Sequence, residues 1–156
     1  MEIRAYRSSD AGATAELFYH TVHRVNCKDY SPTQLDAWAP RGRDLIQWDC
    51  SFQGHMSLVA VEGNALLGFG DITLAGYLDR LFVHKDHQGK GIGTALCDCL
   101  EAMVQGPVVA HVSLTARPFF ERRGYCLVRT QQVERRGVFL PNYVMEKTNG
   151  RVEVPR

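Results

Sequence analysis

The amino-acid sequence predicts a single domain of the α/β (α+β) class, built on a sheet of about seven strands. Its central unit is an apolar run that ends at Val83, a polar turn rich in glycine, and an amphipathic helix over residues 91–104. A second apolar run, residues 108–113, follows that helix. The two runs are therefore expected to be parallel strands joined by a helical crossover.

The chain is predicted to begin with one strand and one helix. Residues 2–7 alternate apolar and polar side chains, which is typical of a strand. Apolar side chains then recur at helical spacing, so a helix is expected to run to about residue 25. The candidates for its N-cap are Ser8, Ser9 and Asp10.

A second helical stretch begins where Ser31 can cap a helix and Pro32 can occupy its first position. Pro40 and Gly42 interrupt this stretch, and helical spacing resumes over residues 43–52. We expect one interrupted helical region here, rich in aromatic side chains.

Three strands are predicted before the crossover helix. Residues 57–62 and 65–74 flank Gly63-Asn64, which is a hairpin signal, and residues 76–83 lead into the glycine turn (residues 84–91). The hairpin signal at Gly63-Asn64 favours antiparallel pairing of the two strands that flank it.

After the crossover, a short helix is expected around Phe119, and strands are expected over residues 125–134 and 138–147. The predicted order is therefore β-α-α-β-β-β-α-β-α-β-β, with about four helices. One domain over residues 1–147 is followed by a polar tail, residues 148–156.

Composition excludes several classes of function. A net charge of +1 provides no field that would attract nucleic acid or an anionic membrane. There is no apolar run long enough to span a membrane and no signal-peptide pattern, so we expect a cytoplasmic protein.

The five cysteines lack the spacing of a disulfide framework. Cys97 and Cys99 would point to different sides of one helix, so they cannot chelate a metal together. His20 and His23 could share a helix face, but no third ligand follows them. No metal cofactor is predicted.

The glycine turn has the features of a phosphate-binding site. Glycine allows positive φ and a close approach of the main chain to an anion, and the helix behind the turn adds free N–H groups and its dipole. The residues do not fit the Walker pattern, and Gly89-x-Gly91-x-Gly93 does not have the dinucleotide spacing. A glycine turn that binds nothing is the alternative.

The spacing that fits is Gln88-x-x-Gly91-x-Gly93, which resembles the pyrophosphate signature of the GNAT N-acetyltransferase superfamily. A second segment, residues 115–125, resembles the fourth helix of that family and its exit into the next strand. At the position of Phe120, many members of the family have a tyrosine. The hydroxyl of that tyrosine protonates the departing CoA thiolate. Phe120 cannot do so.

The resemblance extends over residues 2–147 and is closest to small bacterial members that carry a similar segment at residues 30–38, whose acceptors are generally not assigned. It implies a mixed, mostly antiparallel, twisted sheet in which the central parallel pair splays apart to admit the pantetheine arm. It also implies acetyl-CoA as cosubstrate. The implied cofactor-binding residues are Leu81, Phe82, Val83, Gln88, Gly89, Lys90, Gly91, Ile92, Gly93, Thr94 and Phe120.

Several polar residues are candidates for the proton transfers. Asp79 and His111 are candidate general bases, although either side chain can equally serve a structural ion pair or hydrogen bond. Ser113, Tyr143 or a water molecule are candidates to protonate the thiolate, which hardly needs a strong acid.

The predicted function is transfer of an acetyl group from acetyl-CoA to a primary amine, by direct attack within a ternary complex. The candidate substrate-binding residues are Tyr30, Trp38 and Asp79, and the aromatic pair can equally belong to the core. The rival hypothesis is a non-catalytic module that binds acyl-CoA as a sensor or partner protein. A small amine is the expected acceptor, and a homodimer is left open.

Overall fold

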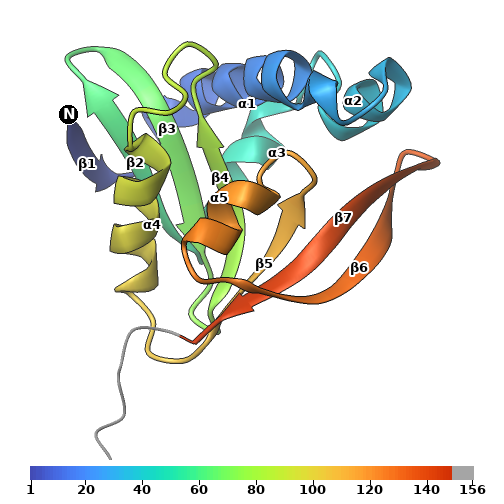
Figure 1. Ribbon diagram of the computed structural model, residues 1–156. Helices are drawn as coiled ribbons and strands as arrows, with labels where there is room; N and C mark the ends of the chain where they lie inside the picture. Colours follow the sequence, from blue (N-terminus) through green and yellow to red (C-terminus); the bar gives the residue numbers. More distant parts are fainter. Residues whose placement is uncertain (149–156) are drawn as a thin grey trace, which may run out of the picture.

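The computed structural model describes residues 1–148 and places a seven-stranded sheet between two layers of helices (Figure 1). The strands are β1 Glu2–Ala5, β2 Met56–Glu62, β3 Ala65–Ile72, β4 Tyr77–Val83, β5 Val108–Ser113, β6 Cys126–Arg135 and β7 Val138–Lys147. The helices are α1 Ala11–Val25, α2 Pro32–Trp38, α3 Leu45–Cys50, α4 Ile92–Glu101 and α5 Arg117–Arg122, with 3-10 turns at Ser8–Asp10 and Asn26–Lys28.

The strand order is β1-β2-β3-β4-β5-β7-β6, and every neighbouring pair is antiparallel except β4 and β5. This confirms the predicted mixed sheet and its central parallel pair. The parallel pairing involves only Tyr77 with Val109 and Leu78 with Ala110, and beyond those residues the two strands are no longer paired to each other. The predicted splay is therefore present, and it begins after the second residue of β4.

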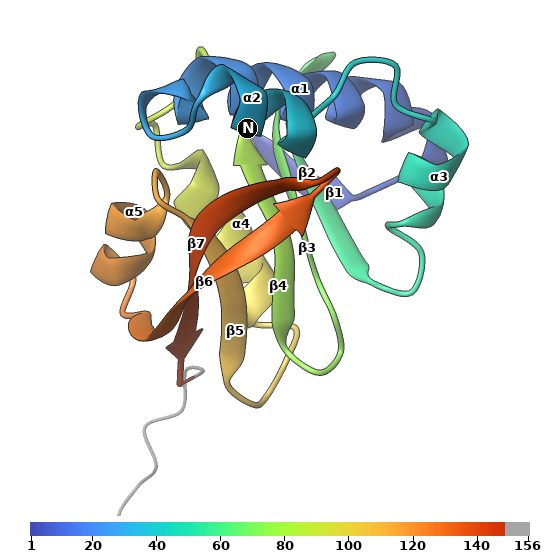
Figure 2. The same ribbon diagram turned by 90° about the vertical axis from the view of Figure 1, so that its right-hand side faces the viewer.

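Two hydrophobic clusters hold the helices on opposite faces of the sheet. One contains Leu96 and Leu100 of α4, and the other contains Phe18 and Val22 of α1 together with side chains of α2 and α3. Strand β2 supplies both clusters, because successive side chains of a strand point to opposite faces. Figure 2 shows α1 and α2 along one end of the sheet and the long β6–β7 hairpin curving toward them.

The helix count differs from the prediction, because the interrupted helical region is two separate helices, α2 and α3. Gly42 has a φ of 73°, which a helix does not allow, and Pro40 lacks the N–H that would continue α2. Each piece has its own N-cap. Ser31 accepts a hydrogen bond from the N–H of Gln34 at 3.2 Å, as predicted, and Asp44 accepts one from Ile46 at 2.9 Å.

The first helix begins directly after Asp10, the last of the three N-cap candidates, which occupies the N-cap position of α1. Ser8–Asp10 forms a 3-10 turn, and no side chain caps α1 at Asp10. The Asp10 carboxylate instead accepts two hydrogen bonds from the guanidinium of Arg4, both at 2.9 Å, and one from the N–H of Arg7. This ion pair links β1 to the start of α1 and lowers the pKa of Asp10.

Other boundaries moved by a few residues. Strand β3 ends at Ile72 rather than at residue 74, because the chain turns there. The N–H of Thr73 closes this turn by donating to the carbonyl of Tyr77. Helix α4 begins at Ile92, since Gly91 has a left-handed φ of 83°. Within residues 1–148 no helix is long and apolar enough to cross a membrane. Of the predicted tail, residues 149–156 lie outside the described residues.

One buried carboxylate connects α4 to two other elements. Glu101, which is 5% exposed, accepts hydrogen bonds from Arg123, Tyr125 and Lys147 at 2.6–2.9 Å. Burial opposes ionisation of Glu101, but these donors outweigh it and lower the pKa of the carboxyl group. The network therefore joins the end of α4 to the exit of α5 and the end of β7.

We expect Glu101→Gln to lower the free energy of unfolding at pH 7 by about 3 kcal/mol, because it leaves two partly buried cations facing a neutral group. The contribution of Glu101 is present above the usual carboxyl pKa and is lost as the pH falls through the lowered one, so the two proteins should converge in acid. Urea unfolding at several pH values measures this. Asp98→Asn is the control, because Asp98 is an exposed partner of Arg123, and equal losses in the two variants would contradict the prediction.

Candidate active site

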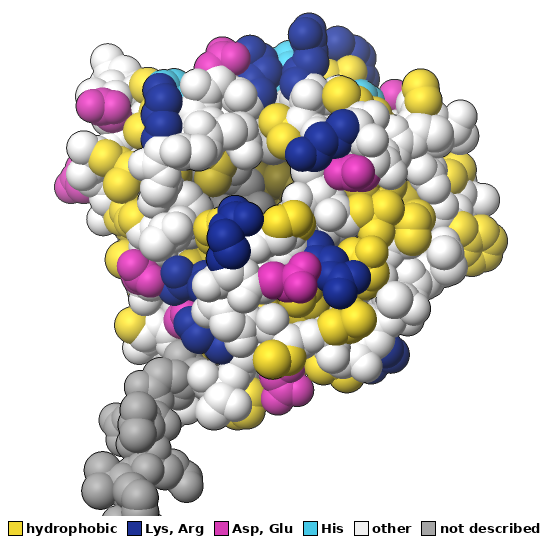
Figure 3. Space-filling model, in the orientation of Figure 1, with side chains coloured by type: hydrophobic (Ala, Val, Ile, Leu, Met, Phe, Trp, Pro, Cys, Tyr) yellow, Lys and Arg dark blue, Asp and Glu magenta, His cyan; other side chains and the backbone are white. Residues whose placement is uncertain are grey.

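Two cavities open on either side of the point where β4 and β5 separate. The first, which we call the aromatic cavity, has a volume of about 340 Å³, and its walls include Phe18, Tyr30, Trp38, Trp48 and Phe82. The second, the turn-side cavity, has a volume of about 740 Å³ and is lined by the glycine turn and the start of α4. Figure 3 shows a hollow on the face that carries α4 and α5, with Lys and Arg side chains around it.

The glycine turn is shaped to leave its backbone exposed. Gly89 and Gly91 have φ values of 73° and 83°, and a side chain at either position would meet no protein atom within 4 Å. The first N–H groups of α4 have no acceptor within the helix and lie behind this turn. Gly93 has a different reason to be glycine, because the Phe119 ring of α5 lies 3.4 Å from where its Cβ would be. The turn-side cavity can therefore receive an anion at the positive end of α4.

Most of the residues predicted to bind the cofactor line the turn-side cavity. They are Leu81, Phe82, Val83, Gln88, Gly89, Gly91, Ile92, Gly93, Thr94 and Phe120. Lys90 is exposed and is not among the lining residues. The side chain of Gln88 donates to the carbonyl of Val83 at 2.8 Å, so it fixes the turn to the end of β4.

Sequence reasoning missed several residues of this cavity. Thr21 of α1 donates to the carbonyl of Val83 at 2.9 Å, while Lys28 and Arg122 place cations on the rim. No motif indicated Thr21 and Lys28, because they come from α1 and the 3-10 turn after it, far from the glycine turn in the sequence. Arg122 lies within the family-like segment over residues 115–125, but nothing in that segment assigned it to the cavity.

The two cavities meet between the separated strands. The residues that line both are Leu81, Phe82, Ser113, Ala116 and Phe120. Phe120 is 5% exposed and packs edge-on against the ring of Tyr125, with the centroids 4.9 Å apart. A ligand in one cavity can therefore approach a ligand in the other at these five residues.

The two candidate bases lie in the aromatic cavity, one residue beyond the last parallel pair on each strand. Between two positions that pair with β3, β4 has one extra residue, Asp79. Burial raises the pKa of Asp79, and the neighbouring Asp71 raises it further. Burial lowers the pKa of His111, as do Arg129 and Arg135, which favours the neutral form of its imidazole.

The two candidate acids lie in different places. Ser113 lines both cavities, and its hydroxyl accepts a hydrogen bond from the N–H of Ala116 at 3.0 Å. Tyr143 lines neither cavity, and the guanidinium of Arg117 lies 4.5 Å from the centre of its ring. The structure therefore brings Ser113 to the junction and places Tyr143 away from it.

The aromatic residues predicted to bind substrate both line the aromatic cavity. Tyr30 is 6% exposed, donates to the carbonyl of Pro141 at 2.7 Å and accepts from the N–H of Leu114 at 3.0 Å. Trp38 packs against Tyr30, with the ring centroids 5.5 Å apart. Tyr30 thus also serves the core, because it bridges Pro141 within β7 and Leu114, the residue that follows β5.

A charged cluster beside the aromatic cavity had no signal in the sequence. Asp71 is fully buried, forms a two-point ion pair with Arg80, and has Nδ1 of His55 2.8 Å from its Oδ2. His55, Asp71 and Asp79 have the ligand types and proximity of a metal site. The guanidinium of Arg80 already binds both oxygens of Asp71, so a metal ion here would face a fixed positive charge.

One polar atom in the aromatic cavity lacks a partner. The side-chain oxygen of Asn142 is buried and accepts no hydrogen bond in residues 1–148. Such an atom destabilises the fold unless a donor is supplied to it. Neither cavity is lined by a cysteine, and burial raises the pKa of the Cys97 thiol to about 12, so that thiol is a poor nucleophile.

Opened parallel strands with an anion-binding turn on one side and a second cavity on the other form the arrangement that the resemblance to acetyltransferases implied. The sequence matches the family described as "Acetyltransferase (GNAT) domain" over residues 26–147. The chain belongs to the GNAT acetyltransferase family.

The similar proteins agree with this assignment. YafP of Escherichia coli strain K12, named as an uncharacterized N-acetyltransferase, is 31% identical over 145 residues, which cover 93% of this chain and 94% of YafP. A crystal structure of a GCN5-related N-acetyltransferase from Rhodopseudomonas palustris has a TM-score of 0.91 and 30% identity, with 94% of each chain covered. The yncA protein of Salmonella typhimurium, solved with its cofactor acetyl-CoA, has a TM-score of 0.71, 20% identity and coverage of 100% and 98%.

We expect Gly91→Val to abolish binding of CoA while the protein stays folded, because a branched side chain would block the turn and oppose its left-handed φ. Gly63→Val is a matched control. Gly63 also has a positive φ, 59°, with open space around it, but it lies in the β2–β3 hairpin and lines neither cavity. Both variants should lose about 1–2 kcal/mol of stability from backbone strain.

Calorimetry with CoA separates the two variants. Only Gly91→Val should lose binding, and CoA affinity equal to that of the parent in this variant would show that the turn is not the phosphate site.

Proposed function

We propose that this chain is an acetyl-CoA-dependent N-acetyltransferase that transfers the acetyl group directly to a primary amine within a ternary complex. The observation that carries the proposal is the junction of two cavities between β4 and β5. The turn-side cavity suits CoA, the aromatic cavity suits the acceptor, and only five residues line both.

The described residues fit acetyl-CoA in a specific way. The glycine turn and the first N–H groups of α4 would bind the pyrophosphate. From Asp79 onward the edge of β4 that faces β5 is not paired with it, so main-chain groups of Leu81 and the N–H of Val83 can pair with the pantetheine amides. The carbonyl of Val83 is already used, because it accepts hydrogen bonds from Thr21 and Gln88.

The N–H of His84 donates to the carbonyl of Leu67 in β3. By the antiparallel alternation the N–H of Phe82 also faces β3, and the N–H groups of Leu81 and Val83 face the gap. Either of these two N–H groups would then be a candidate donor to the thioester carbonyl.

The aromatic cavity offers the groups that attack requires. A protonated amine must lose a proton before it becomes a nucleophile, and Asp79 or His111 would accept it. We favour Asp79, because its raised pKa makes it a stronger base than an ordinary carboxylate, and because its carboxylate lies 3.8 Å from Nδ1 of His55, a partly exposed side chain that could take the proton onward. The amine nitrogen attacks the thioester carbon, and the C–S bond then breaks to release the CoA thiolate. The nitrogen loses its second proton as the amide forms, and that proton balances the one that the thiolate takes up.

Protonation of the thiolate needs little help from the protein. The CoA thiolate is a good leaving group, because the pKa of its thiol is about 8.5. Phe120, which lies at the junction, has no proton to donate. The Ser113 hydroxyl lies at the junction and is the protein donor that we retain, with water as the alternative. Because no cysteine lines either cavity, we propose no covalent acetyl-enzyme.

Phe120 also supports the rival function, a module that binds acyl-CoA without turnover. Its buried ring occupies the junction where many family members have a tyrosine hydroxyl. Thermal stabilisation by acetyl-CoA is expected under both hypotheses, so binding alone does not separate them.

Release of free thiol from acetyl-CoA in the presence of amines tests the function directly. We expect thiol release to depend on both the enzyme and the amine, with N-acetylated product detected by mass spectrometry. Stabilisation by acetyl-CoA without thiol release for any amine would favour the non-catalytic module. A protein that does not bind acetyl-CoA at all would contradict both hypotheses.

We expect Asp79→Asn to lower kcat about 10²–10⁴-fold, because the amide cannot accept the proton. In the parent, kcat/KM should rise with pH through the raised pKa of Asp79, since only the ionised carboxylate is active. That acid limb should disappear in the variant and remain in His111→Gln.

Asp36→Asn is the control for loss of a carboxylate outside the site, because Asp36 is an exposed residue of α2 that lines neither cavity. If His111→Gln instead removes the acid limb and Asp79→Asn keeps it, His111 is the base.

A further inference from the structure

The aromatic cavity is unusually basic for a chain whose net charge is only +1. Within residues 1–148, Asp79 is the one carboxylate that lines the cavity. The cavity is also lined by four arginines, which are Arg43, Arg80, Arg135 and Arg136. A primary amine carries a positive charge when protonated, and four arginines would repel it. The excess of positive charge therefore indicates a second charged group on the acceptor.

The four arginines differ in how well their charge is balanced. Arg80 is neutralised by the buried Asp71 and stacks over the Phe52 ring at 3.8 Å. Arg43 stacks over the rings of Phe18 and Trp48 at 5.1 and 4.8 Å, but in the described residues it makes no hydrogen bond and no ion pair. Burial lowers the pKa of Arg43, and repulsion by Arg136 and Arg80 lowers it further. Its charge is thus held at the cavity without a counterion.

Arg136 is held at the same cavity by an unfavourable backbone. It is the one non-glycine residue with a positive φ, 49°, in residues 1–148, and it forms the β6–β7 turn with Gly137. Asn, Asp or Gly is the usual residue at such a position. The guanidinium donates to the carbonyl of Ala37 at 2.7 Å, which fixes the side chain against α2 but does not balance its charge.

These cations do not serve CoA. The phosphate groups have their own site at the glycine turn, with Lys28 and Arg122 on the rim of the turn-side cavity. Neither Arg43 nor Arg136 lines that cavity. Their anionic partner must therefore enter from the acceptor side.

The rest of the aromatic cavity suits the amino end of the same ligand. The carboxylate of Asp79 would pair with an ammonium group. The rings of Tyr30, Trp38 and Phe82 supply apolar walls.

We propose that the acceptor is a small primary amine that also carries an acidic group, and that Arg43 and Arg136 bind this group in the aromatic cavity. This inference rests on the proposed acetyltransferase function and names the class of its acceptor. A guanidinium fork binds a carboxylate or a phosphate in two-point geometry, so either acid would satisfy the site.

Matched ligands that differ only in the acidic group test the proposal. The pairs are phenylalanine with phenethylamine and 4-aminobutyrate with butylamine, and 2-aminoethylphosphonate represents the phosphate-like acids. Affinity is measured in the presence of CoA by tryptophan fluorescence, because the chain has two tryptophans, Trp38 and Trp48, and both line the aromatic cavity. Thiol release from acetyl-CoA gives kcat/KM for the same ligands.

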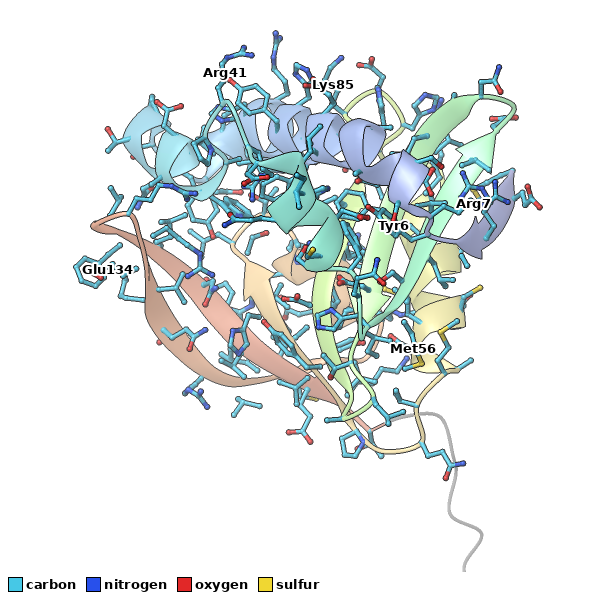
Figure 4. The ribbon with its side chains drawn as sticks, turned by 180° about the vertical axis from the view of Figure 1, so that it is seen from behind. Tyr6, Arg7, Arg41, Met56, Lys85 and Glu134 are labelled. Atoms are coloured by element: carbon cyan, nitrogen blue, oxygen red, sulfur yellow. The ribbon has the colours of Figure 1, made fainter. Side chains whose placement is uncertain are left out.

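We expect the acidic member of at least one pair to bind about 10–100-fold more tightly than the neutral amine, as a charge-assisted pair of hydrogen bonds would provide. Arg43→Met should lower this ratio about 10-fold or more. Arg41→Met is the matched control, because Arg41 also stacks on a ring, that of Tyr19 at 4.5 Å, but is exposed and lines neither cavity. Figure 4 shows Arg41 on the outer side of the helical layer, and its variant should keep the ratio of the parent.

Neutral amines that bind as well as their acidic partners would overturn the proposal, as would an Arg43→Met variant that keeps the parent ratio. So would the failure of every acidic ligand to bind at millimolar concentration. Transfer to neutral amines with no preference for acids would overturn this proposal and leave the acetyltransferase function standing. Loss of acetyl-CoA binding by the parent would instead be a failure of the proposed function itself.

Discussion

Parallel pairing between β4 and β5 stops after Leu78 and Ala110, and the other features of the site depend on this early separation. Backbone groups left unpaired inside a protein are unfavourable unless a ligand or water satisfies them. The main chain of β4 beyond Leu78 can therefore be used for binding. The same separation lets a cavity on one face of the sheet meet a cavity on the other, so two ligands can react without sharing an entrance.

The separated strands are held from outside the gap. Strand β4 pairs along its other edge with β3, and β5 pairs along its whole length with β7, so each strand keeps its sheet hydrogen bonds on one side. The core behind α4 joins the two half-sheets, and the Glu101 network anchors the end of that helix. Tyr30 bridges β7 and the residue after β5 on the opposite face. The gap is therefore a stable part of the fold that does not require a ligand to open it.

Charge distinguishes the two sides of the gap. The turn-side cavity combines backbone N–H groups with rim cations, which suits phosphates. The aromatic cavity has a carboxylate beside the strand separation and arginines whose charge is unevenly balanced, which suits a molecule with charges of both signs. A chain with a net charge of only +1 thus provides two basic regions for different anions, because some cations are paired internally and Arg43 has no carboxylate partner in residues 1–148.

The sequence by itself determined the order of the elements, the glycine turn and the helix that follows it, because these depend on spacing, on proline and on positive φ, which are local properties. It also placed Asp79 and His111 at the centre of neighbouring strands. Only the tertiary structure decided which polar side chains share a cavity. Ser113 lies at the junction of the cavities, whereas Tyr143 lines neither of them. Arg43 from a loop and Arg136 from the distant β6–β7 hairpin line the same cavity. Such residues have no pattern along the chain, because their proximity is produced by the packing of α1, α2 and the β6–β7 hairpin around the open strands.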